Sequence, residues 1–597
     1  MKIYLTAINA KYIHSNLAVY SLQAYANRYL SKEFPVEVAI GEYTINHRSD
    51  DILAGLYKAK PDVLCFSCYI WNITYVTELI REYHKLCPQV PIWVGGPEVS
   101  YEVEAFLQDY PEVTGVMRGE GEQTFLELCE YYGGRSGNLE ENAVREGVVL
   151  SEIAGIAYRF GSEIICTAER PPLDMSSIPF CYDRIEDFTN RIIYYESSRG
   201  CPFRCSYCLS SVEKALRFRN LELVKNELFF FIEKKVPQVK FVDRTFNCNH
   251  THAIEIWRFI GEHDNGITNF HFEISADLLS RDELELLAGL RPGLVQLEIG
   301  VQSTNEATIA EIHRTMQLGR LKETVQALQG AHNIHAHLDL IAGLPFEDYV
   351  TFARSFDEIY ALKPNQLQLG FLKVLKGSYM YEHAQEYGML YRDSAPYEVL
   401  KTRWLDFSEL LKIRKVEEML EVYYNSGQYE VTMKILETQF ESPFAMYLQL
   451  GEFYEYRGYL GMNHSRIRRS EILLEFAREA VAEAVPVLLE SLVYDLYYRE
   501  NLKSRPSWAA DLAEWKPVTR QYCQNGKLTH VERFSYRFPE KSVQTISTLP
   551  RREEKEYFVL FDYTQRDPLD HQAAVRSFAL DLAQGCEEIS VGENNAG

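Results

Sequence analysis

The sequence lacks the features that mark a secreted or membrane-spanning protein. No apolar run approaches the roughly 20 residues that cross a bilayer, and polar residues interrupt the N-terminal stretch where a secretion signal has its apolar core. The twelve cysteines show no disulfide-framework spacing, which predicts free thiols. We therefore expect a cytoplasmic protein with no transmembrane segment.

An excess of positive charge is also lacking. The 597 residues contain 85 acidic and 62 basic side chains, for a net charge of −23. Such a surface repels phosphate backbones, which predicts no general nucleic-acid binding, although a local basic groove remains compatible with it. The length exceeds what one hydrophobic core supports, so we expect several domains.

The alternation of apolar and amphipathic stretches predicts an α/β protein in four parts. Residues 1–135 read as a doubly wound parallel sheet, and residues 136–185 as a β-hairpin with Gly161 in its turn, followed by a proline-rich linker. Residues 186–395 contain six strands with helices between them, which predicts a partial (β/α)6 barrel. Residues 396–597 read as mainly helical, with one strand near the end in "KEYFVLFDYT".

The stretch "SSRGCPFRCSYCLSS" holds three cysteines, Cys201, Cys205 and Cys208, and no fourth. A structural zinc ion usually takes four ligands, often from two C-x2-C pairs, and no second C-x2-C exists. A 4Fe–4S cluster normally takes four thiolates, so three thiolates leave one iron open to another ligand. The loop follows an apolar strand, which places it at the C-terminal mouth of the predicted barrel.

The C-x3-C-x2-C spacing after the first barrel strand resembles the radical S-adenosylmethionine (SAM) superfamily. The resemblance implies that the three cysteines hold a 4Fe–4S cluster whose open iron is chelated by SAM. It further implies an external electron donor of the flavodoxin or ferredoxin type, and reductive cleavage of SAM to a 5′-deoxyadenosyl radical.

The same resemblance implies a set of SAM contacts on the loop and the later strands. They are Tyr207, Glu273, Gln302, Ser303 and Arg314. The alternative for each is an ordinary polar residue at a strand end or on a helix face. The stretch after the second strand, "VDRTFNCN", departs from the family because it has no Gly-Gly-Glu turn.

The N-terminal part resembles the cobalamin-binding domain that precedes many radical SAM barrels. The resemblance implies that Ser67, Gly95, Gly96 and Ser100 line the cobalamin nucleotide tail, and "GEGE" at 119–122 matches a recurring stretch. A tight turn is the alternative for the glycine pair. The cobalt-ligating D-x-H-x-x-G signature is missing, and we favour a capping or surface role for His14 over cobalt ligation.

Together these resemblances predict a cobalamin-dependent radical SAM enzyme acting on a small-molecule or lipid-like substrate. Methyl transfer to an unactivated carbon is the favoured reaction, and cyclisation or rearrangement is an alternative. A tRNA methylthiotransferase is another alternative, but it needs a second cluster, and Cys65, Cys68 and Cys87 read as core residues. A non-catalytic cobalamin-binding regulator is the third. No motif assigns a role to residues 396–597, and we expect them to cap the barrel mouth.

Overall fold

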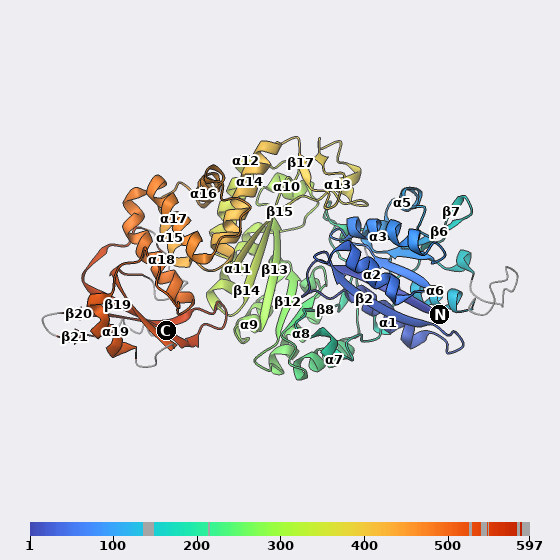
Figure 1. Ribbon diagram of the computed structural model, residues 1–597, viewed down its shortest axis with the longest axis horizontal. Coiled ribbons are helices and arrows are strands. Elements are labelled where there is room, and N and C mark those ends of the chain that lie inside the picture. The colour runs from blue at the N-terminus through green and yellow to red at the C-terminus, as the bar shows by residue number, and fades with distance from the viewer. Residues whose placement is uncertain are drawn as a thin grey trace.

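The computed structural model describes residues 1–134, 149–212, 215–523, 528–538, 546, 548–581 and 585–587. Residues 133–150 are rich in glycine, asparagine and glutamate, which predicts a loop, and most of this stretch lies outside the described residues. Figure 1 shows three regions in a row: an N-terminal sheet domain, a central sheet whose strands fan out, and a C-terminal region. Among the described residues, no helix is both long and apolar enough to cross a membrane.

The N-terminal domain is a doubly wound sheet, as the sequence predicts. Its strand order is β2-β1-β3-β4-β5-β6-β7, and the first five strands are parallel. These strands are β1 (Lys2–Asn9), β2 (Glu37–Thr44), β3 (Val63–Ser67), β4 (Ile92–Gly95) and β5 (Gly115–Met117). Its helices are α1 (Leu17–Tyr29), α2 (Ser49–Ala59), α3 (Ile73–Leu86), α4 (Pro97–Ser100), α5 (Val103–Asp109) and α6 (Glu122–Gly134).

Helices cover both faces of this sheet because each buried strand is apolar on both sides. Leu64 and Phe66 of β3 pack with α2 and α3, whereas Cys65 packs with α1 and α6 on the other face. The predicted hairpin forms from β6 (Ile156–Phe160) and β7 (Glu163–Cys166), with Gly161 at φ 61° in its turn. It pairs antiparallel with β5 and so extends the sheet.

The central region is a parallel six-stranded sheet with the order β15-β14-β13-β12-β11-β8. Its strands are β8 (Ile193–Tyr195), β11 (Gln238–Phe241), β12 (Asn269–Ile274), β13 (Val295–Gln302), β14 (His335–Ala342) and β15 (Gln366–Phe371). Its helices are α7 (Leu221–Glu233), α8 (His250–Glu262), α9 (Arg281–Ala288), α10 (Glu306–Glu311), α11 (Leu318–Ala331) and α12 (Tyr349–Tyr360). This arrangement confirms the predicted partial barrel.

The two faces of the barrel strands differ in chemistry. Phe270 and Phe272 of β12 join the hydrophobic core, and Phe272 packs on Trp257 of α8. His271, between them, points to the opposite, inner face, because successive side chains of a strand alternate. There His271 Nε2 lies 3.0 Å from Glu298 Oε2. The inner face is therefore polar.

The chain after β15 first borders the barrel mouth and then forms a helical layer. The border contains α13 (Tyr379–Glu382), β16 (Leu390–Tyr391) and β17 (Val399–Lys401). The helices are α14 (Phe407–Leu420), α15 (Glu430–Glu437), α16 (Pro443–Arg457), α17 (Arg466–Ala480), α18 (Val485–Arg499) and α19 (Lys516–Tyr522). Asn425, just after α14, binds the edge strand β15 by donating to Leu367 O and accepting from Leu367 N, at 2.9 and 3.0 Å.

The last part of the chain corrects the sequence prediction of a single strand. It is a four-stranded antiparallel sheet of β18 (Thr529–Tyr536), β19 (Arg552–Arg566), β20 (Ala573–Asp581) and β21 (Gly585–Glu587). β19 is the predicted strand, and it is longer than predicted. Its partners have mixed burial rather than clean alternation; β18 buries the adjacent Val531 and Glu532, for example, which weakens the period-two signal.

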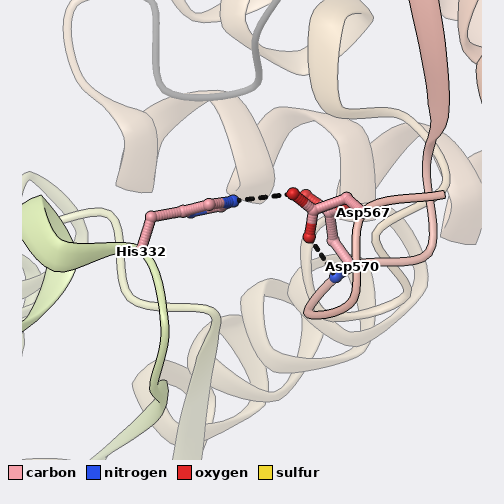
Figure 2. Close-up of side chains that lie close together, drawn as sticks. All are labelled: His332, Asp567 and Asp570. Carbon is pink, nitrogen blue, oxygen red and sulfur yellow. Dashed lines mark hydrogen bonds and ion pairs between the residues drawn. The ribbon is translucent and has the colours of Figure 1, made fainter. Parts of the chain in front are cut away.

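This terminal sheet lies against the barrel at the end opposite to the mouth. His332, just before β14 begins, has its Nε2 3.1 Å from Asp567 Oδ2 in the turn after β19. Figure 2 shows this pair and the neighbouring Asp570, whose backbone N–H donates to Asp567. The expectation that residues 396–597 cap the mouth is therefore wrong for the terminal sheet.

Candidate active site

The three predicted cluster cysteines lie in one loop at the C-terminal end of β8. We call residues 197–211 the cluster loop. Its first part forms β9 (Ser198–Arg199), which pairs antiparallel with β10 (Arg217–Phe218). Gly200 has φ 90°, and a Cβ there would lie 2.5 Å from Ala215 O. Glycine is therefore required where the loop turns away from β9.

The start of the cluster loop is anchored to Asp243, which follows β11. Asp243 accepts hydrogen bonds from the backbone N–H of Ser197 at 3.0 Å, the Ser197 hydroxyl at 2.7 Å and the Ser198 hydroxyl at 2.5 Å. Burial raises the pKa of Asp243. The Ser197 hydroxyl also lies 3.0 Å from Nε2 of His252, whose pKa burial lowers to about 4.

The rest of the loop is held by backbone hydrogen bonds. Ser206 N–H donates to Ile312 O at 2.9 Å, and Ser206 O accepts from Met380 N–H at 2.9 Å. Cys208 N–H closes a turn onto Cys205 O at 3.1 Å. Both sides of the barrel mouth thus position the cysteines.

The three thiols of the cluster loop lie too far apart to be ligands of one zinc ion. Cys205 is buried, and Cys201 and Cys208 are half-buried. Four thiolates around one zinc lie about 3.8 Å apart, since the Zn–S bond is about 2.3 Å. Within the described residues, Cys201, Cys205 and Cys208 do not form a group whose ligand atoms all lie within 4.8 Å of one another. The three thiols are therefore not gathered into a site for a single zinc ion.

Arg314 connects the thiols to the later strands. Its Nη1 lies 3.8 Å from Cys205 Sγ and 3.4 Å from the Tyr207 hydroxyl, and its Nη2 donates to Gly300 O. Burial raises the pKa of Cys205, and Arg314 opposes that shift. Two of the predicted SAM contacts, Tyr207 and Arg314, thus lie beside the cysteines.

The other predicted SAM contacts have different surroundings. Gln302 follows a register shift in β13, adopts φ 73°, and has a buried side-chain oxygen with no hydrogen-bond partner. Ser303 is fully buried and donates to Glu347 Oε1 at 2.6 Å. Burial, helped by Glu298, raises the pKa of Glu273 to about 7. Among the predicted SAM contacts, Gln302 Oε1 and Arg314 Nε are thus buried polar atoms without a hydrogen-bond partner.

The predicted cobalamin contacts gather at the C-terminal edge of the first sheet. Ser67 on β3 is in register with Gly95 on β4, and the Ser100 hydroxyl donates to Gly96 O at 2.8 Å. Gly96 has φ 119°, and a Cβ there would lie 2.4 Å from Cys68 O. The tight-turn alternative therefore accounts for Gly96 by itself, because the protein's own backbone fills that space.

His14 lies where the first sheet meets the barrel. Its Nδ1 is 2.6 Å from the Tyr194 hydroxyl on β8, and burial lowers its pKa. The neighbouring Ile13 O accepts from Ile192 N–H at 2.8 Å. This bonding gives His14 a role in the contact between the domains.

The sequence analysis missed an aromatic pair at the same edge. Tyr69 and Trp71, in the loop after β3, stack with ring centroids 4.4 Å apart and 6° between their planes. The Trp71 side chain is anchored by donation to Ile8 O at 3.1 Å. Burial raises the pKa of Tyr69 to about 12, and the barrel residue Glu196 adds to the shift. The available signal was two aromatics directly after a buried strand, in "CYIWN".

The edge of the first sheet faces the barrel mouth on a second side as well. The Tyr397 hydroxyl donates to Glu98 at 2.8 Å, and Lys376 pairs with Glu102 at 2.8 Å. Glu98 lies in α4 and Glu102 follows it, and their partners follow β15. The C-terminal ends of both parallel sheets therefore meet, which is where sheets of this kind bind ligands.

The cysteines of the N-terminal domain do not resemble a second cluster site. Cys65 and Cys68 are buried in the two cores, and burial raises the pKa of Cys65 to about 12. Cys87 packs against the core at the far end of α3. The prediction of core packing is confirmed.

Family models match three successive stretches of the chain. The model of the B12 binding domain matches residues 4–129, and that of the Radical SAM superfamily matches 195–359. The model of a family of unknown function, DUF4080, matches 385–561. The chain joins a B12-binding domain to a radical SAM domain. The predicted two-domain pairing is thereby confirmed.

The chain is also similar to curated relatives and to a solved structure. The cobalamin-dependent radical SAM methyltransferase TokK of Streptomyces tokunonensis is 27% identical over 327 residues, 50% of this chain and 44% of TokK. The anaerobic magnesium-protoporphyrin IX monomethyl ester cyclase of Cereibacter sphaeroides is 22% identical over 321 residues, 52% and 51% of the two chains. The chain thus spans about half the length of these relatives. The structure of the cobalamin-dependent SAM radical enzyme OxsB superposes with a TM-score of 0.58 at 15% identity, covering 83% of this chain and 80% of OxsB.

Proposed function

We propose that this chain is a cobalamin-dependent radical SAM enzyme that methylates an unactivated carbon. The observation that carries the proposal is the meeting of the cluster loop with the B12-binding sheet edge at one barrel mouth. Cys201, Cys205 and Cys208 hold a 4Fe–4S cluster, and Ser67, Gly95, Gly96 and Ser100 border cobalamin. When bound, these groups supply an electron and a 5′-deoxyadenosyl radical from SAM, and a methyl group from methylcobalamin.

The chain's own residues bind and orient these groups. Arg314 brings positive charge to the cluster thiols, and Gln302 offers its unpartnered side-chain oxygen to SAM, beside Tyr207 and Glu273. Ser303 acts through Glu347 by fixing the loop after β14. A flavodoxin- or ferredoxin-type donor supplies the electron from outside. The protein positions the reactants and excludes water from them.

The inner face of the barrel favours a small polar substrate over a lipid-like one. Lys240 pairs with Glu298 at 2.9 Å, and His337 pairs with Asp339 at 3.1 Å on the neighbouring strand. Packing an apolar chain against these groups would remove their water without replacing its hydrogen bonds. A polar molecule can supply those bonds instead.

The test is product formation by anaerobically reconstituted protein given a strong reductant and SAM. We expect 5′-deoxyadenosine, about one cobalt and about four irons per chain. Replacing Cys205 with Ala should abolish 5′-deoxyadenosine, whereas replacing the exposed Cys166 should leave it unchanged. Cleavage of SAM that survives the Cys205 replacement would overturn the cluster assignment.

Cyclisation remains the second candidate because the matched relatives include a cyclase. The two reactions differ in where the methyl group of SAM goes. Methylation consumes a second SAM and gives S-adenosylhomocysteine together with 5′-deoxyadenosine, whereas cyclisation gives 5′-deoxyadenosine without it. A purely regulatory cobalamin protein would give neither product.

A further inference from the structure

Two arginines of the cluster loop region reach into the B12-binding domain. Arg199 on β9 and Arg217 on β10 are direct partners in the short antiparallel ladder. Both approach the turn that follows β5, where Glu120 and Glu122 lie. Both glutamates belong to the "GEGE" stretch at 119–122. The sequence matched this stretch to a cobalamin-binding domain but did not predict what it contacts.

The contacts form a connected network of ion pairs. Arg199 Nη2 lies 2.6 Å from Glu122 Oε1, and Nη1 lies 3.2 Å from Glu122 Oε2, which makes the pair bidentate. Nη1 of Arg199 is also 3.7 Å from Glu120, and its Nε donates to Glu196 at 2.8 Å. Arg217 donates to Glu120 and, at 2.7 Å, to Leu173 O in the linker.

These side chains are largely withdrawn from water. The Arg199 and Glu122 side chains are 15% and 5% exposed. Although burial opposes its ionisation, Arg199 lowers the pKa of Glu122, so the carboxylate is charged. A buried ion pair is costly unless its geometry is good, and removing one partner strands a charge. The network is therefore satisfied only when the two domains are docked as they are here.

The network acts on the segment that leads into the cluster cysteines. Arg199 is separated from Cys201 by Gly200 alone, and the preceding Ser197 and Ser198 are fixed to Asp243 of the barrel. Asp243 of the barrel thus fixes Ser197 and Ser198, and Glu122 of the B12-binding domain fixes the next residue, Arg199. The glutamates follow β5, at the same sheet edge as Gly95 and Gly96.

We propose that Arg199 is a positioning residue that couples cobalamin binding to the stability of the iron–sulfur cluster. Cobalamin at the sheet edge fixes the turn carrying Glu120 and Glu122, and Arg199 transmits that order to the cluster loop. By reciprocity the cluster strengthens cobalamin binding by the same factor. This inference rests on the proposed function, because it requires that both groups bind.

The test compares iron release with and without cobalamin in the full-length, anaerobically reconstituted protein. A ferrous chelator removes the iron, and the release rate is followed by absorbance, with hydroxocobalamin either absent or saturating. In the unaltered protein we expect hydroxocobalamin to slow iron release about tenfold, within the usual range of coupling between two sites. In Arg199→Gln the ratio should fall to about one, while hydroxocobalamin still binds by its visible spectrum. Arg199→Lys keeps the charge without the bidentate geometry, so its ratio should lie between.

A matched control breaks a comparable ion pair elsewhere. Arg170 pairs with Glu127 of α6, with side chains 13% and 21% exposed, and does not touch the cluster loop. Arg170→Gln should keep the tenfold ratio. Glu122→Gln repeats the test from the other partner, in case Arg199→Gln does not fold, and should also give a ratio near one.

Two results would overturn the inference, and they differ from failure of the proposed function. The coupling is absent if both cofactors bind the unaltered protein but hydroxocobalamin leaves the release rate unchanged. Arg199 is not the link if Arg199→Gln and Glu122→Gln both keep the ratio of the unaltered protein. If the unaltered protein binds no hydroxocobalamin or assembles no cluster, the proposed function fails, and this inference fails with it.

Discussion

The two ends of the barrel are joined to their neighbouring regions in contrasting ways. At the mouth, Arg199 and Glu122 pair with side chains 15% and 5% exposed. At the opposite end, His332 and Asp567 pair with side chains 35% and 31% exposed, and His332 carries charge only when protonated (Figure 2). The first contact includes a residue of the cluster loop, Arg199, and the second lies at the opposite end of the barrel strands.

This difference separates contacts that organise a site from contacts that only attach a region. A buried, bidentate pair demands one geometry, since a misplaced partner leaves an unpaired charge. A half-exposed pair tolerates movement, because water replaces either partner. Disturbing the mouth should therefore affect cofactor retention and stability together, whereas disturbing the far end should affect stability alone and only slightly.

The largest effect is expected from Asp243→Ala at the mouth. Three hydrogen bonds to a buried carboxylate are lost, at roughly 1.5 kcal/mol each. We expect thermal unfolding to show a loss of about 4.5 kcal/mol, and the reconstituted variant to retain much less iron. The measurements are a melting curve and iron content per chain.

Asp264→Ala is the control for this prediction. Asp264 accepts two hydrogen bonds from Arg291, at the end of the barrel away from the cluster loop. Its loss should lower the melting temperature but leave the iron content unchanged. Equal iron loss in both variants would mean that Asp243 supports the fold in general and has no special relation to the loop.

The sequence predicted what depends on local pattern at the mouth. The spacing of Cys201, Cys205 and Cys208 singled them out, and the resemblance to the radical SAM superfamily implied their cluster role. The parallel sheets follow from the alternation of apolar strands with helices. Gly161 predicted the turn of its hairpin because a tight turn needs a residue that tolerates positive φ.

The partners of those residues were not predictable, because they lie far away in the chain. Glu122 and Arg199 are 77 positions apart, and Ser197 and Asp243 are 46 apart. Each residue by itself reads as a surface charge or a strand end. At the far end, the mixed burial of β18 gives no clear alternation of apolar and polar residues. The sequence therefore predicted only β19 of the terminal sheet.

A second prediction concerns how the stability of the fold depends on pH through Glu347, a buried residue at the mouth. Burial raises the pKa of Glu347, after β14, from 4.5 to about 7. A carboxyl group whose folded pKa is raised stabilises the fold fully below its unfolded pKa, and that stability is lost as pH rises through about 7. Glu347→Gln should remove this dependence, which amounts to at most ~3 kcal/mol between pH 4.5 and 8.

The measurement is the difference in unfolding free energy between Glu347→Gln and the unaltered protein at pH 5 and at pH 8. Relative to the unaltered protein, Glu347→Gln should have a higher free energy of unfolding at pH 8 than at pH 5. Glu285→Gln is the control, since it removes an exposed carboxyl group, which pairs with Arg281 on the outer helix α9. An equal difference for Glu347→Gln at both values would show that Glu347 is ionised throughout the range.

The smallest effect is expected from His332→Ala at the far end. The pair with Asp567 is half-exposed, and such pairs contribute about 0–1 kcal/mol. We expect the free energy of unfolding to fall by no more than about 1 kcal/mol. Iron content and the cobalamin effect on iron release should stay as in the unaltered protein. A variant that loses iron here would show that the far end communicates with the mouth through β14, and the contrast between the two ends would not hold.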